Sequence, residues 1–322
     1  MDTKRLFCVL MFSTFGLMRV NAANVTDAFL HQGLTHDYVI FYTDVPVKTR
    51  TVTAESGDQT RVLVFLADVA IPQKKFLQHL NNKTPRGYEF SCDYQQHDVV
   101  CSFLYPRGTC NVHVSNQTNW HDIATVVIEC KRTVPLAPLA HRDPLIVLDA
   151  GHGGSKPGAH GLFGLVEKNL TLRFCKKVRA CLTARGYNVL LTRESDYWMP
   201  LDERTSLANL HGATLLISFH CNNARDKQAR GVETLYSTPN SKTLAQFIHE
   251  QIAQIPLKNV VDRGVKMGLL QTLFGCECPA VMLELFFLSN TDDAQQLKDD
   301  RLQAVITTSV CKAIDKFMAL QK

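Results

Sequence analysis

Two histidines and two glutamates in the second half of the sequence are the side chains best suited to chemistry. His152, Glu167 and His220 supply two imidazoles and a carboxylate. A catalytic Zn²⁺ takes such a donor set and keeps a fourth position for water. Glu284 lies in an apolar segment, where an ionisable group is costly unless it is paired or functional. Because a carboxylate there could take a proton from the water and pass it to a departing amine, we predict zinc-dependent amide hydrolysis.

Taken singly, three of these residues have simpler explanations. A histidine after a strand is often an ordinary loop residue, and the helix dipole favours a glutamate at the start of a helix. However, His152, His220 and Glu284 each follow or end an apolar run typical of a buried strand, and Glu167 opens an amphipathic segment. Because parallel strands end at one edge of a sheet, we expect all four side chains to converge there.

Three further residues have types and positions that suggest a role. Asp149 and Asn222 flank the two histidine segments and are candidates for hydrogen bonds to the metal ligands or the substrate. Ser309 begins an S-x-x-K motif, the nucleophile signature of penicillin-interacting enzymes. The sequence contains no K-T-G, and the motif lies in an amphipathic C-terminal segment, so a structural role is favoured for Ser309.

The region that carries these residues, 145–322, alternates apolar runs with amphipathic segments. The expected strands occupy 145–148, 187–191, 215–219, 232–236 and 280–286, and the expected helices 167–184, 201–210, 244–255 and 302–320. Such alternation indicates an α/β fold with a mostly parallel sheet flanked by helices.

Residues 24–133 have a different character and predict a small β-rich domain. Short runs rich in β-branched and aromatic residues are separated by turn sequences, which is typical of strands. These runs occupy 37–45, 61–69, 98–105, 111–115 and 125–130. Pro135, Pro138 and Pro144, without hydrophobic periodicity, indicate a linker over 134–144.

Residues 1–22 have the pattern of a secretory signal peptide. Lys4 and Arg5 precede an apolar run at 6–18, and a small residue, Ala22, ends the segment. A membrane anchor is disfavoured because a spanning helix needs roughly 20 apolar residues. We therefore expect an exported protein, periplasmic or extracellular, with no transmembrane span in the mature chain.

Composition and charge exclude other classes of protein. Hydrophobic residues make up 45% and charged residues 20%, which excludes a disordered or fibrous chain. The net charge of +5 is small and scattered, so nucleic acid is not an expected partner. The chain has 11 cysteines, and export favours disulfides. The four between residues 24 and 133 allow three connectivities, among which the sequence does not choose.

Residues 145–320 resemble the zinc-dependent N-acetylmuramoyl-L-alanine amidases, a family of cell-wall hydrolases. The resemblance is carried, in the family's order, by LDAGHGG (148–154), EKNL (167–170), LTR (191–193), SFHCN (218–222), GVE (231–233) and PAVMLE (279–284). It implies zinc at His152, Glu167 and His220, with Glu284 as the catalytic glutamate. The implied reaction is hydrolysis of the amide between N-acetylmuramic acid and L-alanine in peptidoglycan, in cell-wall remodelling, daughter-cell separation or recycling.

The sequence departs from the family pattern in a few places. Ala150 replaces a proline, Cys221 replaces a small residue, and Phe286 replaces a glycine. We expect the Cys221 side chain to point into the sheet and Phe286 to narrow the substrate pocket. Family members that act in division carry a long insertion with a blocking helix after the second histidine. Only residues 223–230 stand there in this chain, so we expect no such plug.

The β-rich domain is weakly similar, through residues 60–65 and 98–103, to the AMIN-type domain that localises such amidases to the envelope. This similarity implies peptidoglycan and envelope division proteins as partners. Two other functions remain open, a zinc peptidase that cuts within the stem peptide and a non-catalytic wall-binding or activator protein. The complete set of two histidines and two glutamates argues against the latter.

Overall fold

The computed structural model describes residues 22–71, 77, 80–81, 88–95, 97–118, 124–136, 144–255 and 260–321. The expected signal peptide, apart from residue 22, and residues 137–143 of the expected linker lie outside these ranges. Within them, no helix is both long and apolar enough to cross a membrane.

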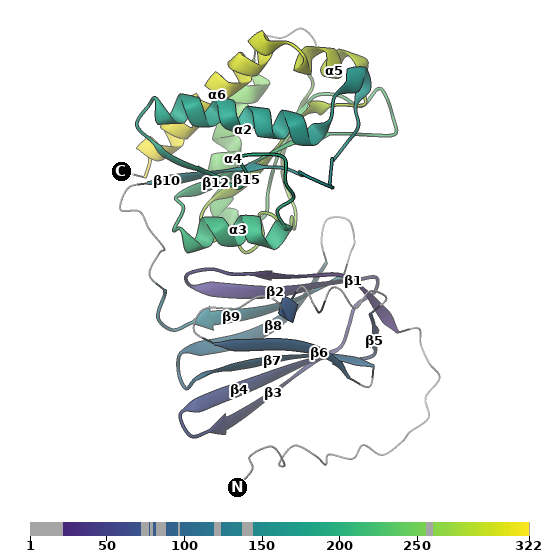
Figure 1. Ribbon diagram of the computed structural model, residues 1–322, viewed down its shortest axis with the longest axis vertical. Coiled ribbons are helices and arrows are strands. Elements are labelled where there is room, and N and C mark those ends of the chain that lie inside the picture. Colours follow the sequence, from purple (N-terminus) through teal and green to yellow (C-terminus); the bar gives the residue numbers. More distant parts are fainter. Residues whose placement is uncertain are drawn as a thin grey trace.

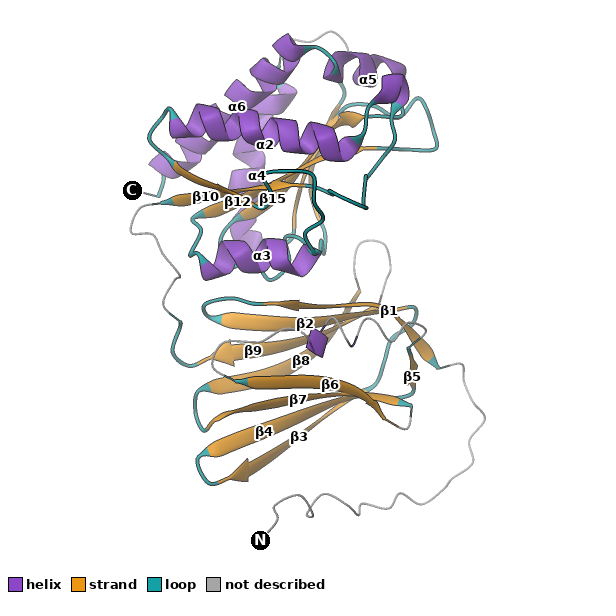
Figure 2. Ribbon diagram, viewed as in Figure 1, coloured by secondary structure: helices purple, strands orange, loops and turns teal. Residues whose placement is uncertain are grey.

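The described residues before position 137 form two facing β-sheets (Figures 1 and 2). The first sheet contains, in spatial order, β5 (Val69–Ala70), β1 (Ala23–His31), β2 (His36–Thr43), β9 (Ala124–Arg132) and β8 (Cys110–Thr118). The second contains β3 (Thr49–Ser56), β4 (Gln59–Leu66), β7 (Asp98–Pro106) and β6 (Glu89–Gln95). In β4, Val62, Val64 and Leu66 alternate into the shared core, as the two-residue period of a strand requires.

The second half of the chain forms a six-stranded sheet with helices on both faces. Its spatial order is β11 (Asn188–Leu191), β10 (Leu145–Ala150), β12 (Leu215–Asn222), β15 (Ala280–Phe287), β13 (Val232–Tyr236) and β14 (Asp262–Met267). All neighbours are parallel except β13 and β15, which are antiparallel. The prediction of an α/β fold with a mostly parallel sheet, preceded by β-rich sheets, is confirmed.

The central strands are buried on both faces, which explains their continuous apolar sequences. In β10, Ile146 and Leu148 face the core beneath α2 (Glu167–Thr183), α4 (Lys242–Ala253) and α6 (Asp300–Ala319). Leu145 and Val147 face the opposite side, which α3 (Leu201–Leu210) covers. The short α5 (Thr291–Leu297) follows β15 (Figure 1).

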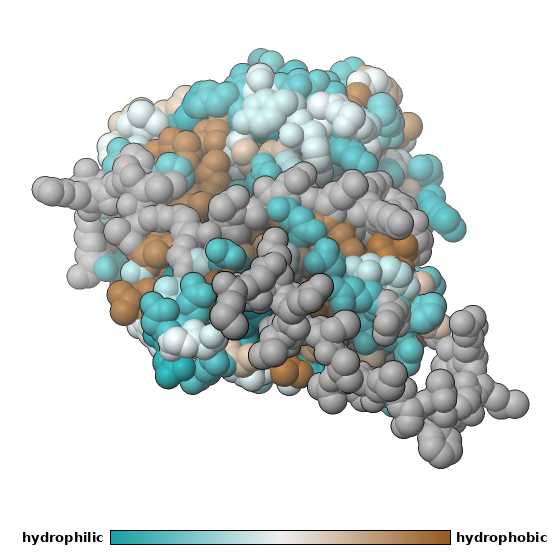
Figure 3. Space-filling view, turned by 60° about the horizontal axis from the view of Figure 1, so that its bottom comes forward, coloured by the Kyte–Doolittle hydropathy of each residue, from teal (hydrophilic) through white to brown (hydrophobic). Residues whose placement is uncertain are grey.

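The first N-terminal sheet packs against the α3 side of the second half (Figure 1). Its apolar outer face, which includes Phe29 and Tyr42, is covered by Leu201 at the start of α3 and by Phe274. The ring centroids of Tyr38 and Phe274 lie 5.6 Å apart in an edge-on arrangement. On the face seen in Figure 3, the exposed hydrophobic side chains form separate patches among hydrophilic ones.

Side chains of α3 and the carboxylate of Glu277 join the two halves by hydrogen bonds. Glu277, in the segment before β15, accepts from the backbone N–H groups of Leu34 at 2.8 Å and His36 at 2.9 Å. It also accepts from the backbone N–H and the hydroxyl of Thr35. Hydrogen bonds to an ionised group are stronger than neutral ones, so Glu277 anchors the turn between β1 and β2 to the second half.

Replacing this carboxylate is expected to destabilise the protein. Because Glu277→Ala leaves the three N–H groups of the turn without their acceptor, the free energy of unfolding should fall by about 1.5–3 kcal/mol. Urea unfolding followed by far-UV circular dichroism measures the change. Glu250→Ala, which removes one partner of an exposed ion pair with Lys316, should change the stability by about 0–1 kcal/mol. Equal losses for the two variants would contradict the proposed anchoring.

Candidate metal centre

Two buried arginines hold the loop that follows β10. The guanidinium of Arg193 donates to the carbonyl of Ala150 at 2.9 Å and to that of Gly151 at 3.0 Å. The guanidinium of Arg204, from α3, donates to the carbonyl of Ala150 at 2.7 Å and to that of His152 at 2.8 Å. These bonds fix three successive carbonyls and support the left-handed backbone of His152, whose φ is 61°.

Asp149 compensates part of the positive charge of these arginines. Its fully buried carboxylate pairs with Arg204 at 2.7 Å and accepts hydroxyl hydrogen bonds from Ser218 at 2.5 Å and Thr192 at 2.8 Å. Burial alone raises the pKa of Asp149, but Arg204 and the hydroxyl donors outweigh burial and lower it. Asp149 therefore influences the histidine loop through Arg204.

The structure brings His152, Glu167 and His220 together at the carboxyl edge of the sheet. One donor atom from each lies within 4.8 Å of the others. Glu167 Oε1 is 2.9 Å from Nε2 of His152 and 3.0 Å from Nδ1 of His220. The histidine side chains are 27% and 15% exposed, so solvent reaches a site whose carboxylate is otherwise buried.

The backbone orients the Glu167 carboxylate in the first turn of α2. Its Oε2 accepts from the N–H of Ala159 at 2.8 Å, and its Oε1 accepts from the N–H of Cys221 at 3.1 Å. Burial raises the pKa of Glu167, but the hydrogen bonds with His152 and His220 dominate and hold it well below its usual range. The carboxylate is therefore ionised, as a metal ligand must be.

The donor set fits a zinc ion. Two ligand atoms about 2.1 Å from a tetrahedral Zn²⁺ lie roughly 3.4 Å apart, close to the separations between Glu167 and the two imidazoles. Two glycines make room for the set. A Cβ on Gly151 would lie 2.4 Å from Cε1 of His220, and a Cβ on Gly158 would lie 2.5 Å from Oε2 of Glu167.

Glu284 faces the same site from the neighbouring strand. It is directly opposite His220 in the β12–β15 register and opposite Glu233 in the β13–β15 register. Its Oε2 is buried and has no hydrogen-bond partner among the described residues. Burial raises the pKa of Glu284 to about 7; His220 opposes the rise, and the carboxylates of Glu167 and Glu233 add to it. Unpaired, buried and with a pKa near neutrality, this carboxylate suits proton transfer.

Beside Glu284 lies a polar network in which only Asn222 was predicted as functional. Glu233 accepts from the side-chain amide of Asn222 at 2.7 Å, from Arg263 at 3.2 Å and from the ammonium of Lys266. Asn222 is thus bound to Glu233, and within the described part of the chain its side chain makes no hydrogen bond to His152, Glu167 or His220. The GVE segment marked Glu233 as part of the family pattern, but the role of its carboxylate depends on side chains from other strands.

The two unusual residues beside the site both pack into the core. Cys221 is 3% exposed and lies in the core beneath α2, and burial raises the pKa of its thiol, as expected for a side chain that points into the sheet. Phe286 is 1% exposed in the same core, so the expectation that it narrows the pocket is wrong. A bulge in β15 after Glu284 explains this placement. Phe286 adopts φ 64°, a conformation that favours glycine.

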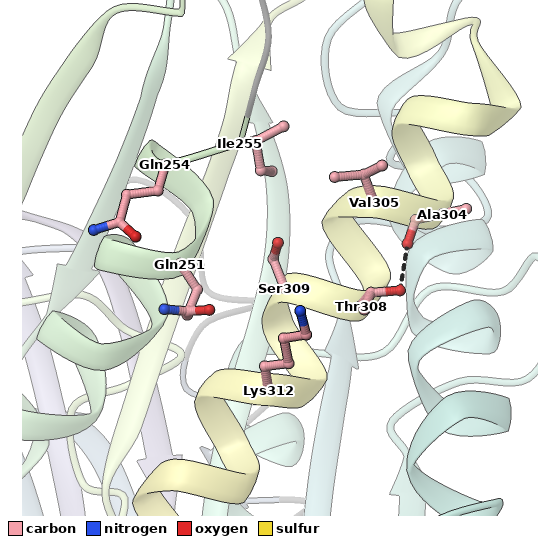
Figure 4. Close-up of a pocket in the computed structure, with 8 residues that line it drawn as sticks. All are labelled: Gln251, Gln254, Ile255, Ala304, Val305, Thr308, Ser309 and Lys312. Carbon is pink, nitrogen blue, oxygen red and sulfur yellow. Dashed lines mark hydrogen bonds between the residues drawn. The ribbon is translucent and has the colours of Figure 1, made fainter.

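Two other expectations concern the surroundings of the site. Residues 223–230 contain no helix and form a short loop, in agreement with the expected lack of a plug. The S-x-x-K motif lies on helix α6, where Ser309 and Lys312 line a groove between α4 and α6 (Figure 4). Lys312 is exposed, unlike the desolvated lysine that activates a nucleophile. The groove measures about 410 Å³ and is lined by Gln251, Gln254, Ile255, Ala304, Val305, Thr308, Ser309 and Lys312.

Comparison with known proteins defines the class to which this fold and site belong. Residues 146–316, more than half of the chain, match the family model described as N-acetylmuramoyl-L-alanine amidase. The chain therefore belongs to this family and is an N-acetylmuramoyl-L-alanine amidase that acts on peptidoglycan. The match begins at residue 146, so the β-rich N-terminal part lies outside it.

Individual relatives agree with this assignment. The sporulation-specific N-acetylmuramoyl-L-alanine amidase of Bacillus subtilis is 33% identical over 183 residues, covering 55% of this chain and 69% of that protein. The amidase LytC of Bacillus subtilis is 35% identical over 173 residues, which cover 52% of this chain and only 34% of LytC. Among solved structures, the catalytic domain of CwlV from Bacillus (Paenibacillus) polymyxa var. colistinus has a TM-score of 0.52 and 29% identity, with coverage of 55% and 98%. AmiC2 of Nostoc punctiforme also has a TM-score of 0.52 and 29% identity.

A small steric change should test the site. Gly151→Ala places a methyl group against the His220 ring and the carbonyl of Phe219, so the imidazole must move. We expect the affinity for Zn²⁺ to fall by about 10–100-fold, as when the support of a ligand is lost. Isothermal titration with Zn²⁺ measures the affinity. Gly186→Ala, at an open position away from the site where φ is 86°, also strains the backbone; it is the control for strain alone and should bind Zn²⁺ like the wild type. Unchanged affinity in Gly151→Ala would contradict the site as described.

Proposed function

We propose that His152, Glu167 and His220 hold a catalytic Zn²⁺ and that Glu284 is the general acid–base of peptidoglycan amide hydrolysis. The observation that carries this proposal is the buried, unpartnered Oε2 of Glu284 on the strand next to His220. A bound zinc ion at such a site polarises the scissile carbonyl and lowers the pKa of water. A purely structural carboxylate in this position would need a hydrogen-bond partner.

The residues of the chain then have distinct tasks. Glu284 accepts the proton of the attacking water at Oε2 and returns it to the nitrogen of L-alanine as the amide bond to the lactyl group breaks. A pKa near 7 suits both directions of transfer. Arg193 and Arg204 keep His152 in place through the loop carbonyls, and Glu233 contributes negative charge that favours protonation of Glu284.

The cellular setting is part of the proposal. The pattern of residues 1–22 supports cleavage of a signal peptide and a periplasmic location, where peptidoglycan is accessible. We further propose a role in cell-wall remodelling and cell division. In this role the β-rich N-terminal part, docked through Glu277, recruits the enzyme to the envelope through peptidoglycan or division proteins.

Substitution of the proposed acid–base tests the mechanism. Glu284→Gln keeps the shape of the side chain but cannot accept the proton, so kcat on purified sacculi should fall by about 10²–10⁴-fold. The Zn²⁺ content should be unchanged, because Glu284 is not among the proposed ligands. Mass analysis of released fragments gives the rate, and Glu250→Gln at an exposed position serves as the control.

The fragments also separate the alternatives. Free, intact stem peptides released by the wild type support the amidase. Shortened stems would instead indicate a peptidase that cuts within the stem. Equal release by wild type and Glu284→Gln would refute the role of Glu284, and no release by either protein would indicate a non-catalytic wall-binding protein or activator.

A further inference from the structure

Most of the cysteines in the described residues lie beside another cysteine. All ten are thiols in this structure, and eight of them form four neighbouring pairs. The pairs are Cys92 with Cys101, Cys110 with Cys130, Cys181 with Cys311, and Cys276 with Cys278. Cys175 and Cys221 lie outside these pairs.

Two pairs link neighbouring strands of the N-terminal sheets. Cys92 on β6 is directly opposite Cys101 on β7, and their sulfur atoms are 2.7 Å apart. Cys110 on β8 and Cys130 on β9 lie on paired antiparallel strands, where Cys130 is directly opposite Val112, two residues along from Cys110, and the two thiols are close enough to interact. All four side chains are buried in the same core, so the structure selects one of the three possible connectivities.

The third pair links two helices that cover the same face of the catalytic sheet. Cys181 near the end of α2 is a neighbour of Cys311 in α6, close enough for the two thiols to interact, although the two residues are far apart in the sequence. The two helices are in direct contact (Figure 1). Cys311 is fully buried, whereas Cys181 is partly exposed and accessible to an oxidant.

We propose that the mature protein carries three disulfides, Cys92–Cys101, Cys110–Cys130 and Cys181–Cys311. The proposal rests on the export proposed above, because an oxidising compartment is needed. Each disulfide forms when two thiols lose two protons and two electrons to the disulfide of a thiol oxidant, which is reduced to two thiols. Cys276 and Cys278 are left out of the proposal because a bond between them would close a minimal loop and restrict the unfolded chain very little.

The burial of the sulfur atoms predicts the order in which the three disulfides are reduced. The four N-terminal sulfur atoms are in a closed core, so these two bonds form as the domain folds and then resist reductants in the folded protein. The Cys181–Cys311 bond has one partly exposed sulfur atom and is attacked first. The N-terminal bonds therefore cross-link the two β-sheets internally and stabilise the β-rich part, and the third bond fixes α2, which carries Glu167, against α6.

Thiol mapping of the exported full-length chain tests the proposal. The protein is purified from a bacterial periplasm, its thiols are alkylated after denaturation, and it is digested without reduction for mass spectrometry. The proposal expects the three named linkages, with Cys175 and Cys221 alkylated. Mild reduction of the folded protein should open Cys181–Cys311 first. Alkylation of any of the six cysteines before reduction, a different linkage, or earlier opening of an N-terminal bond overturns the proposal.

Two controls separate this proposal from the others. The mass of the N-terminal peptide shows whether residues 1–22 were removed. If they were kept, export has failed, and the chain is then refolded with oxidised glutathione. The refolded chain must give the same three linkages, or the proposal is overturned. Cys181→Ala should leave Cys311 alkylated and the two N-terminal linkages intact, whereas Cys175→Ala should keep all three. Stem-peptide release from sacculi, measured in parallel, reports on the proposed function independently.

Discussion

The position of His152 depends on hydrogen bonds to its own carbonyl and to the carbonyls of the two residues before it. Buried guanidinium groups from the loop after β11 and from α3 hold the carbonyls of Ala150, Gly151 and His152, and Asp149 compensates part of their charge. Removing one partner of such a buried charge network leaves the other charge unpaired and costs about 3–5 kcal/mol. These hydrogen bonds restrain the backbone of the loop that carries the imidazole, which reduces the reorganisation that ion binding requires.

Strand register supplies the rest of the site. Because β12 and β15 are parallel neighbours, His220 and Glu284 end at the same level of the sheet without any special loop. Glu167 enters from α2, on the side opposite α3, and reaches the edge where the strands end. The bulge at Phe286 interrupts the regular ladder immediately after Glu284, as bulges next to active sites commonly do.

Sequence reasoning predicted the features that depend on periodicity and order. The alternation of apolar runs gave the α/β fold, and the shared edge of parallel strands placed His152, His220 and Glu284 together. It missed features that depend on partners distant in sequence. β3 is almost entirely exposed and shows no apolar alternation, and β14 is a half-buried edge strand with polar residues. The roles of Arg193, Arg204 and Glu233 appear only when their hydrogen-bond partners are known. Likewise, the glycine-like conformation of Phe286 can be recognised only when the register of β15 is known.

The central claim is that one divalent ion binds between His152, Glu167 and His220, and X-ray anomalous scattering at the zinc absorption edge tests it most directly. Crystals of the full-length protein grown with Zn²⁺ should show an anomalous peak about 2.0–2.2 Å from Nε2 of His152, Nδ1 of His220 and a carboxylate oxygen of Glu167. The oxygen atoms of Glu284 should lie beyond bonding distance. A peak at other residues, or none at this site in crystals with bound zinc elsewhere, would contradict the account.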